Sequence, residues 1–245
     1  MARVYAGIDI GTAHVKVVIT MEEPGGGLRV AGAALSVSKG MRHGYIVNVS
    51  DAAKSVGEAL ERAQRAAGVR VRHARLAIGG VGLDELKSAG EISLTASGGE
   101  VTERDMQRVI QESERRASSK LVNKKVIHAI PLAFRIDGTE ILGRPVGMKG
   151  TKLSVDTLLI TAFEQHVNDL IAAVEMAHVE IDDIMASPLA ASLATLTKAQ
   201  KIAGVVLANI GAETVSIVVF ENDTPISVKV LPVGSSDITS DLALS

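Results

Sequence analysis

The 245-residue sequence contains no cysteine and no tryptophan, and its aromatic residues are two tyrosines and three phenylalanines. The absence of cysteine excludes disulfide bonds, thiolate nucleophiles and cysteine-ligated zinc, and it agrees with a reducing compartment. So few aromatic rings cannot build a platform on which nucleic-acid bases stack. The sequence therefore predicts an aliphatic core, and any chemistry has to rest on other residue types.

An excess of charge of one sign is also missing, because 26 Lys and Arg residues oppose 28 Asp and Glu residues. Without a basic field to hold phosphate backbones, we predict no nucleic-acid partner. No run of about 18 apolar residues occurs, and the N-terminus has no signal-peptide pattern. We expect a globular protein of one or two domains that by itself neither crosses nor binds a membrane.

Patterns of the common metal and hydrolase sites are absent as well. The six histidines show no His-x-x-x-His spacing, and neither a Gly-x-Ser-x-Gly nor a Gly-x-x-x-x-Gly-Lys-Ser/Thr motif occurs. We interpret His128, inside an apolar run, as a core or edge residue with a satisfied ring. The basic stretch Lys39–His43 is interpreted as a solvated loop rather than a contact surface.

Periodicity and turn residues predict alternating strands and helices. Strands are expected at residues 3–9, 14–20, 28–36, 74–80, 92–95, 126–136, 153–160, 202–210, 214–221 and 226–231. Helices are expected at residues 52–67, 102–125, 163–177 and 188–197. Asp51 and Ser187 are the predicted N-caps of the first and last helix, and Gly68 is the predicted stop of the first.

The first three strands recur near the end of the chain. The segment 9–19 aligns without a gap on 209–219, and four of the 11 positions are identical. Each copy has an apolar strand, a turn with glycine at its third position, a second strand, a polar turn and a third strand. We interpret the copies as a duplicated domain, in which the two glycine turns face each other across a cleft.

The turn at Asp9-Ile-Gly-Thr12 suits a nucleotide's phosphates. Glycine lets backbone N–H groups approach phosphate oxygens, and a carboxylate at the strand end can hold the waters of a Mg²⁺ ion. By itself this pattern is also typical of an ordinary hairpin turn. The second copy favours the nucleotide interpretation.

Several longer motifs resemble the superfamily of actin, heat-shock chaperones and sugar kinases, and within it the bacterial cell division protein family FtsA. Asp9-Ile-Gly-Thr-Ala-His-Val-Lys16 is similar to the first phosphate loop of the family, and Gly204-Val-Val-Leu-Ala-Asn-Ile-Gly211 to the second. Three further stretches resemble FtsA more specifically: Val126–Pro131 with Ile136–Gly138, Pro145–Gly150 with Leu153, and Pro232–Gly234 with Asp237–Asp241.

The resemblance implies an α/β fold: an actin-like (ribonuclease H-like) lobe with an inserted α+β SHS2 subdomain, and the first strands of a second actin-like lobe. It implies four parts. Residues 1–80 and 162–200 would form the first lobe, 81–161 the SHS2 insertion, and 201–245 the start of the second lobe. Because the family continues beyond the motif at Asp241, we expect a fragment or a shortened relative.

The resemblance also implies a site for ATP and Mg²⁺. The cofactor-binding residues it suggests are Asp9, Gly11, Thr12, Ala13, Lys16, Asn209, Gly211 and Thr214, with Asp9 as the metal ligand. The second loop departs from the family pattern Asp-Ile-Gly-Gly-Gly-Thr-Thr, because Asn209 replaces the carboxylate and Glu213 stands at a glycine position. Near the phosphates Glu213 would repel them, and the alternative is that it points to solvent. We therefore expect weak or lost ATP binding, doubtful hydrolysis and no catalytic residue.

By resemblance, the leading function is a non-enzymatic cell division scaffold. In full-length form it would link the FtsZ ring to the cytoplasmic face of the membrane, bind other divisome proteins and self-associate through SHS2, with Gly143–Gly150 as the most exposed contact. Its localisation would be cytoplasmic, and peripheral on the inner membrane face where a C-terminal helix is present. The alternatives are a PilM-like pilus assembly protein and a sugar-kinase-like or ATPase-like enzyme on the same fold.

Overall fold

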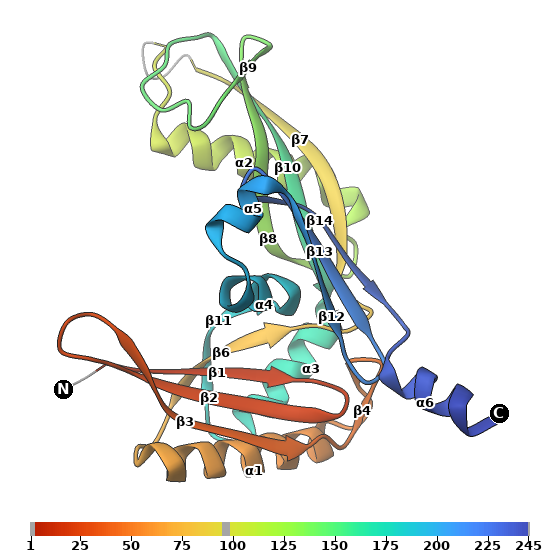
Figure 1. Ribbon diagram of the computed structural model, residues 1–245. Helices are drawn as coiled ribbons and strands as arrows, with labels where there is room; N and C mark the ends of the chain where they lie inside the picture. The colour runs from red at the N-terminus through yellow and green to blue at the C-terminus, as the bar shows by residue number, and fades with distance from the viewer. Residues whose placement is uncertain (1–2, 95–98, 245) are drawn as a thin grey trace.

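A mixed five-stranded sheet forms the base of the molecule (Figure 1). The computed structural model describes residues 3–94 and 99–244. The strand order in this sheet is β11 (Glu180–Ala186), β6 (His73–Ile78), β1 (Val4–Ile10), β2 (His14–Glu22) and β3 (Leu28–Val37). β1, β2 and β3 form an antiparallel meander, whereas β6 and β11 run parallel to β1. The first predicted meander is thereby confirmed.

Two helices, α1 (Val49–Ala67) and α3 (Glu164–Glu175), pack on one face of this sheet. Strand β2 alternates, so Val15, Val17 and Ile19 are fully buried beneath these helices. α1 lies so close to β3 that a Cβ at Gly32 would stand 2.3 Å from the carbonyl oxygen of Ala63. The opposite face is covered in part by α4 (Ser187–Thr195) and is otherwise open.

A second, antiparallel sheet is inserted between β6 and α3. Its strand order is β7 (Asp84–Ser93), β10 (Lys152–Phe163), β8 (Lys124–Ile136) and β9 (Thr139–Ile141), and α2 (Glu103–Ala117) packs on it. This part has its own apolar core, formed by Leu94, Val101, Met106, Val109, Phe134, Ile136, Leu153 and Val155. The insertion therefore carries a hydrophobic cluster separate from that of the five-stranded sheet.

The third sheet is the second meander, formed by β12 (Val205–Ile210), β13 (Val215–Glu221) and β14 (Thr224–Leu231). Helix α5 (Lys198–Ala203) precedes it and α6 (Ser235–Leu244) follows it. Val218, Phe220 and Val228 join the apolar core of the first sheet. A short hairpin of β4 (Met41–Arg42) and β5 (Tyr45–Ile46) completes the four sheets of the described residues.

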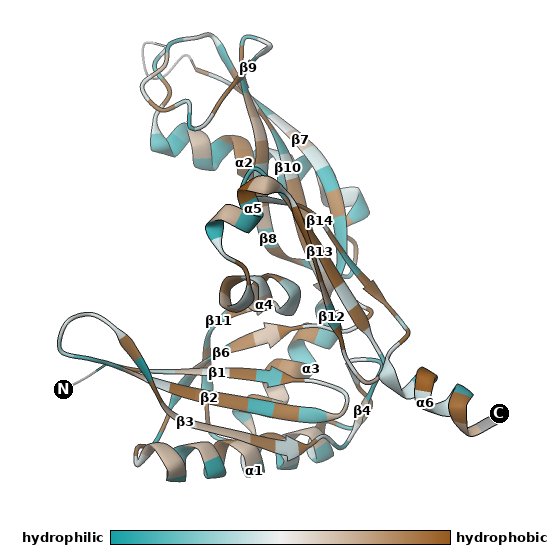
Figure 2. Cartoon of the chain, viewed as in Figure 1, coloured by the Kyte–Doolittle hydropathy of each residue, from teal (hydrophilic) through white to brown (hydrophobic). Residues whose placement is uncertain are grey.

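Hydropathy follows this architecture (Figure 2). Apolar residues concentrate along the strands, whereas α6 extends away from the sheets with Ile238 and Leu242 exposed. Among the helices of the described residues, none combines the length and apolar character that a membrane crossing requires.

Three predicted helix boundaries are wrong. The N-cap of α1 is Asn48, whose side chain accepts the N–H of Asp51 at 3.1 Å, so Asp51 lies inside the first turn. In α4 the N-cap is Ala186, and Ser187 is already helical. The helix predicted to reach residue 125 ends at Ala117, because a 3₁₀ turn (Ser118–Lys120) redirects the chain into β8. The stop at Gly68 is confirmed by its φ of 69°.

Several elements were absent from the sequence prediction or misplaced in it. β7 starts at Asp84 rather than at residue 92, and Thr95 of the predicted strand lies outside the described residues. β4, β5, β9, β11, α5 and α6 were not predicted. Residues 202–203, predicted as strand, belong to α5. The interpretation of His128 is confirmed, because its Nε2 accepts the N–H of Ala186 at 3.0 Å.

Candidate functional site

The turns of the two meanders line one cavity of about 460 Å³. All eight residues that the sequence suggested as a cofactor site contribute to its wall: Asp9, Gly11, Thr12, Ala13, Lys16, Asn209, Gly211 and Thr214. Further wall residues that sequence reasoning did not assign are Gly44, Gly79, Gly80, Ser187 and Ser235. The glycine pair that follows β6 was a usable signal, whereas Gly44 and Ser235 stand in segments without a periodic pattern.

The two turns have the same backbone geometry. The N–H of Gly11 donates to the carbonyl of His14 at 3.1 Å, and the N–H of Gly211 donates to that of Thr214 at 2.8 Å. In both meanders the pairing of the second and third strand shifts at the equivalent place, between residues 19 and 20 and between residues 219 and 220. These equivalences agree with the gapless alignment of the two sequence copies.

At the strand ends, the first turn carries an ion pair, and the equivalent pair of residues in the second turn is neutral. Lys16 Nζ lies 2.7 Å from Asp9 Oδ2, and the two residues are opposite each other in the β1–β2 ladder. At the equivalent positions, Asn209 faces Ser216. The charges of Asp9 and Lys16 therefore cancel at the cavity, and the residues of the second turn that line its wall are uncharged.

The donor set does not resemble a strong metal site. Asp9 already accepts a hydrogen bond from Lys16, and Asn209 supplies only an amide. Within residues 3–94 and 99–244, no group of three or more His, Cys, Asp or Glu side chains could hold a metal ion. The wall does offer the ammonium group of Lys16 and the hydroxyl groups of Thr12 and Thr214, which suit phosphate oxygens.

Glu213 behaves differently from both alternatives that the sequence left open. Its Oε2 accepts the backbone N–H of His43 at 2.6 Å, and its carbonyl oxygen lies 3.3 Å from His43 Nδ1. Glu213 is absent from the cavity wall, so it neither faces the phosphate position nor points freely into solvent. The interpretation of Lys39–His43 as a solvated loop is wrong at His43.

A buried histidine supports the Gly79–Gly80 wall. His166 is 3% exposed, and its Nε2–H donates to the carbonyl of Gly79 at 3.0 Å. Burial lowers the pKa of His166, which favours the neutral ring, and the Nε2–H tautomer of that ring can donate this hydrogen bond. The ring of Tyr45 packs on it with a centroid distance of 4.7 Å. The β4–β5 hairpin and α3 thereby fix the wall from behind.

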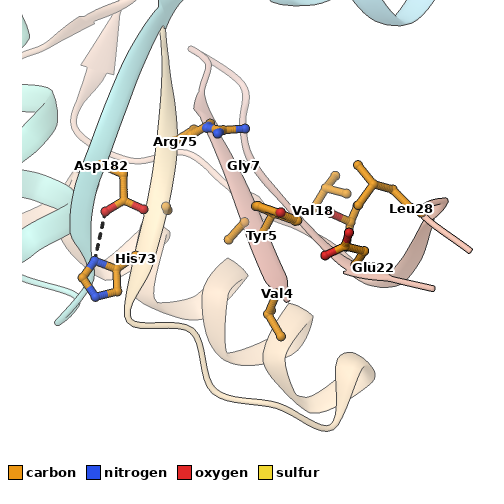
Figure 3. Close-up of a pocket in the computed structure, with 13 residues that line it drawn as sticks. Val4, Tyr5, Gly7, Val18, Glu22, Leu28, His73, Arg75 and Asp182 are labelled. Atoms are coloured by element: carbon orange, nitrogen blue, oxygen red, sulfur yellow. Dashed lines mark hydrogen bonds and ion pairs between the residues drawn. The ribbon is translucent and has the colours of Figure 1, made fainter. Parts of the chain in front are cut away.

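A larger cavity, of about 700 Å³, lies on the open face of the five-stranded sheet (Figure 3). The guanidinium of Arg75 stands 5.8 Å from the centre of the Tyr5 ring, and His73 Nδ1 lies 3.0 Å from Asp182 Oδ1. None of the eight predicted site residues lines this cavity.

Comparison with known proteins finds similarity to the cell division protein FtsA. Residues 80–161 match the model of the SHS2 domain inserted in FtsA. The cell division protein FtsA of Bacillus subtilis is 31% identical over 98% of this chain and 54% of that protein. FtsA of Escherichia coli is 27% identical over 98% of this chain and 56% of that protein. The chain thus spans about half the length of the curated relatives it matches.

Solved structures agree at the level of the fold. The PilM–PilN type IV pilus biogenesis complex is similar with a TM-score of 0.71 and 17% identity, covering 98% of this chain and 65% of that one. The ethanolamine utilization protein EutJ from Carboxydothermus hydrogenoformans gives a TM-score of 0.54 at 17% identity, covering 98% and 56%. The predicted α/β actin-like fold with an SHS2 insertion is confirmed. Over nearly its whole length, the chain is similar to the cell division protein FtsA, and residues 80–161 match the SHS2 domain inserted in FtsA.

Proposed function

We propose that this chain serves in a non-enzymatic cell division scaffold. The observation that carries the proposal is similarity to FtsA over 98% of the chain together with the SHS2 domain. In proteins of the full family length, the proposed scaffold links the FtsZ ring to the cytoplasmic face of the membrane and binds other divisome proteins. We assign no catalytic residue.

The cavity between the two turns is the proposed nucleotide site. Lys16 and the hydroxyl groups of Thr12 and Thr214 would hold phosphate oxygens, and Asp9 would contact a hydrated Mg²⁺ ion. The ion would have to compete with Lys16 for that carboxylate. This competition, with the neutral Asn209, supports weak binding of Mg-ATP without hydrolysis.

The tip of the SHS2 domain is the proposed surface for self-association. Leu142 is 97% exposed, and Val146 and Met148 follow it with exposed side chains in the same loop. An ion pair between Arg144 and Glu103, 2.6 Å long, ties this loop to α2. An apolar loop held in one position suits a contact with a second copy.

The function can be tested with a chimera in Bacillus subtilis FtsA, in which this chain replaces the aligned segment. We expect the fluorescently tagged chimera to accumulate at the division site and to support division. A matched chimera with Leu142→Asp and Met148→Asp should reach the site less well, whereas Val122→Asp, at an exposed position before β8, should behave as the parent chimera. A stable chimera that stays diffuse would overturn the proposal.

A further inference from the structure

We propose that Glu213 is a latch that holds the two turns of the cavity together. The proposal concerns the regulation of the proposed nucleotide site. It rests on nucleotide binding only in the part of the experiment that adds Mg-ATP. Its structural basis is the tip of the β4–β5 hairpin, which contacts both turns.

The hairpin tip presents two successive backbone N–H groups. Arg42 pairs with Tyr45, and the two residues between them, His43 and Gly44, have φ values of 47° and 78°. Two positive φ values are typical of a two-residue hairpin turn. The N–H of Gly44 donates to Thr12 Oγ1 at 3.0 Å, and the N–H of His43 donates to Glu213 Oε2 at 2.6 Å. The N–H of Gly44 therefore binds the first turn, and the N–H of His43 binds the second.

The tip itself is fixed to the first lobe. A Cβ at Gly44 would stand 2.3 Å from the Cα of Gly80, so the two backbones are in close contact. Next to the tip, Tyr45 packs on the buried His166. Because the tip has little freedom, Glu213 and its turn are the parts that can move away.

The hydrogen bond between Glu213 and the hairpin tip has no counterpart at the equivalent position of the first copy of the repeat. In the alignment of the two turns, Ala13 occupies the position of Glu213 and lines the cavity. The side chain of Glu213 is 33% exposed and accepts a short, charge-assisted hydrogen bond. Glu213 therefore binds the hairpin tip, whereas the equivalent Ala13 lines the cavity.

A second carboxylate holds the far side of the meander. Glu85 of β7 accepts the N–H of Val228 at 2.6 Å and the hydroxyl of Ser227 at 3.0 Å. Loss of the Glu213 carboxylate would therefore loosen the cavity end of the meander, where the 3.3 Å contact between His43 Nδ1 and the Glu213 carbonyl remains, while the SHS2 end stays attached. The latch predicts local opening at the turns rather than general unfolding.

Hydrogen exchange of the ligand-free chain, followed by mass spectrometry, tests the latch. In Glu213→Ala we expect exchange at residues 42–44 and 210–214 to accelerate about tenfold, as for loss of a hydrogen bond to a charged group. Glu213→Gln keeps an acceptor oxygen and should show a smaller change. Glu221→Ala removes an exposed carboxylate from the same meander and should show none. Exchange at Val228 should stay slow in all three.

Unchanged exchange at residues 42–44 in Glu213→Ala, or an equal rise in Glu221→Ala, would overturn the latch. The ligand arm repeats the measurement with Mg-ATP, which should restore protection of residues 210–214 in Glu213→Ala. If the ligand-free result holds and Mg-ATP restores nothing, the nucleotide site fails and the latch stands.

Discussion

Lys16 sets the charge that a phosphate group would meet in the cavity. Of the described residues in the wall it is the one Lys or Arg, and it pairs with Asp9. We expect Lys16→Gln to weaken binding of a fluorescent ATP analogue about tenfold, because a charge-assisted contact is lost. Unfolding free energy should change by about 0.5 kcal/mol or less, since the pair is largely exposed. Lys54→Gln, which removes an exposed ion pair on α1, is the control; equal affinities in the two variants would contradict the assignment.

Asp105 gives a prediction about pH. The hydroxyl of Thr102 donates to its carboxylate at 2.6 Å and holds the pKa of Asp105 below its ordinary value of 3.8. The ionised form is favoured in the folded state, so its stabilising effect is present above pH 3.8 and is lost as the pH falls through the lowered value. Asp105→Asn should cost about 1 kcal/mol at neutral pH. Urea unfolding should show that difference shrinking in acid, and Gln107→Ala on the exposed side of α2 should show no such trend.

At the residue scale, the sequence predicted which residues line the cavity where a local pattern exists. A strand and a turn with glycine at its third position recur at Asp9 and Asn209, and together with the resemblance to FtsA they suggested the eight wall residues before the structure. The partner of Glu213 could not, because His43 lies 170 positions away in a segment without periodicity. Asn48 and Asp51 are both good caps, and the choice depends on whether Val49 and Ser50 are helical.

At the scale of elements, the contact between α1 and β3 depends on a missing side chain. A Cβ at Gly32 would stand 2.3 Å from Ala63 O and 2.8 Å from Ala67 N, both backbone atoms of α1. Gly32→Ala should therefore separate helix and strand and cost about 1–3 kcal/mol or more. Gly57→Ala, in the same helix with no atom within 4 Å of the new methyl, should stabilise the protein by about 0.5–1 kcal/mol. Thermal unfolding distinguishes them; equal effects of one sign would refute the close-packing argument.

Element prediction failed where strands carry polar residues. β7 contains charged side chains through most of its length, so no alternation of apolar residues predicted a strand before residue 92. Its place is fixed by pairing with β10, in which Leu158, Leu159 and Ile160 are fully buried. β11 is similar, because Glu180, Asp182 and Asp183 interrupt its apolar residues while β6 supplies its backbone partners. Such strands are determined by the sheet rather than by their own composition.

At the scale of the whole molecule, Glu85 joins the SHS2 insertion to the second meander. Without its carboxylate the buried N–H of Val228 loses its acceptor, which costs about 1–3 kcal/mol. In Glu85→Ala we expect faster hydrogen exchange at residues 224–231 and earlier proteolytic cleavage in the meander. Ser227→Ala removes only the hydroxyl donor and should have a smaller effect. If residues 224–231 remain as protected as in the parent, the attachment does not depend on Glu85. No sequence pattern pointed to this contact, because it joins residues 142 and 143 positions apart.

The register shift that the two meanders share also bears on their evolutionary origin. A bulge is a one-residue irregularity that families tend to keep, and here it falls after residue 19 in one copy and after residue 219 in the other. Two hairpins of independent origin would each need the same one-residue insertion. One ancestral hairpin that carried the insertion and was then copied needs the insertion only once. If the two meanders are a duplicated domain, as the sequence alignment suggests, the irregularity dates from before the duplication. It can be used as a marker of common origin in relatives whose side chains no longer align.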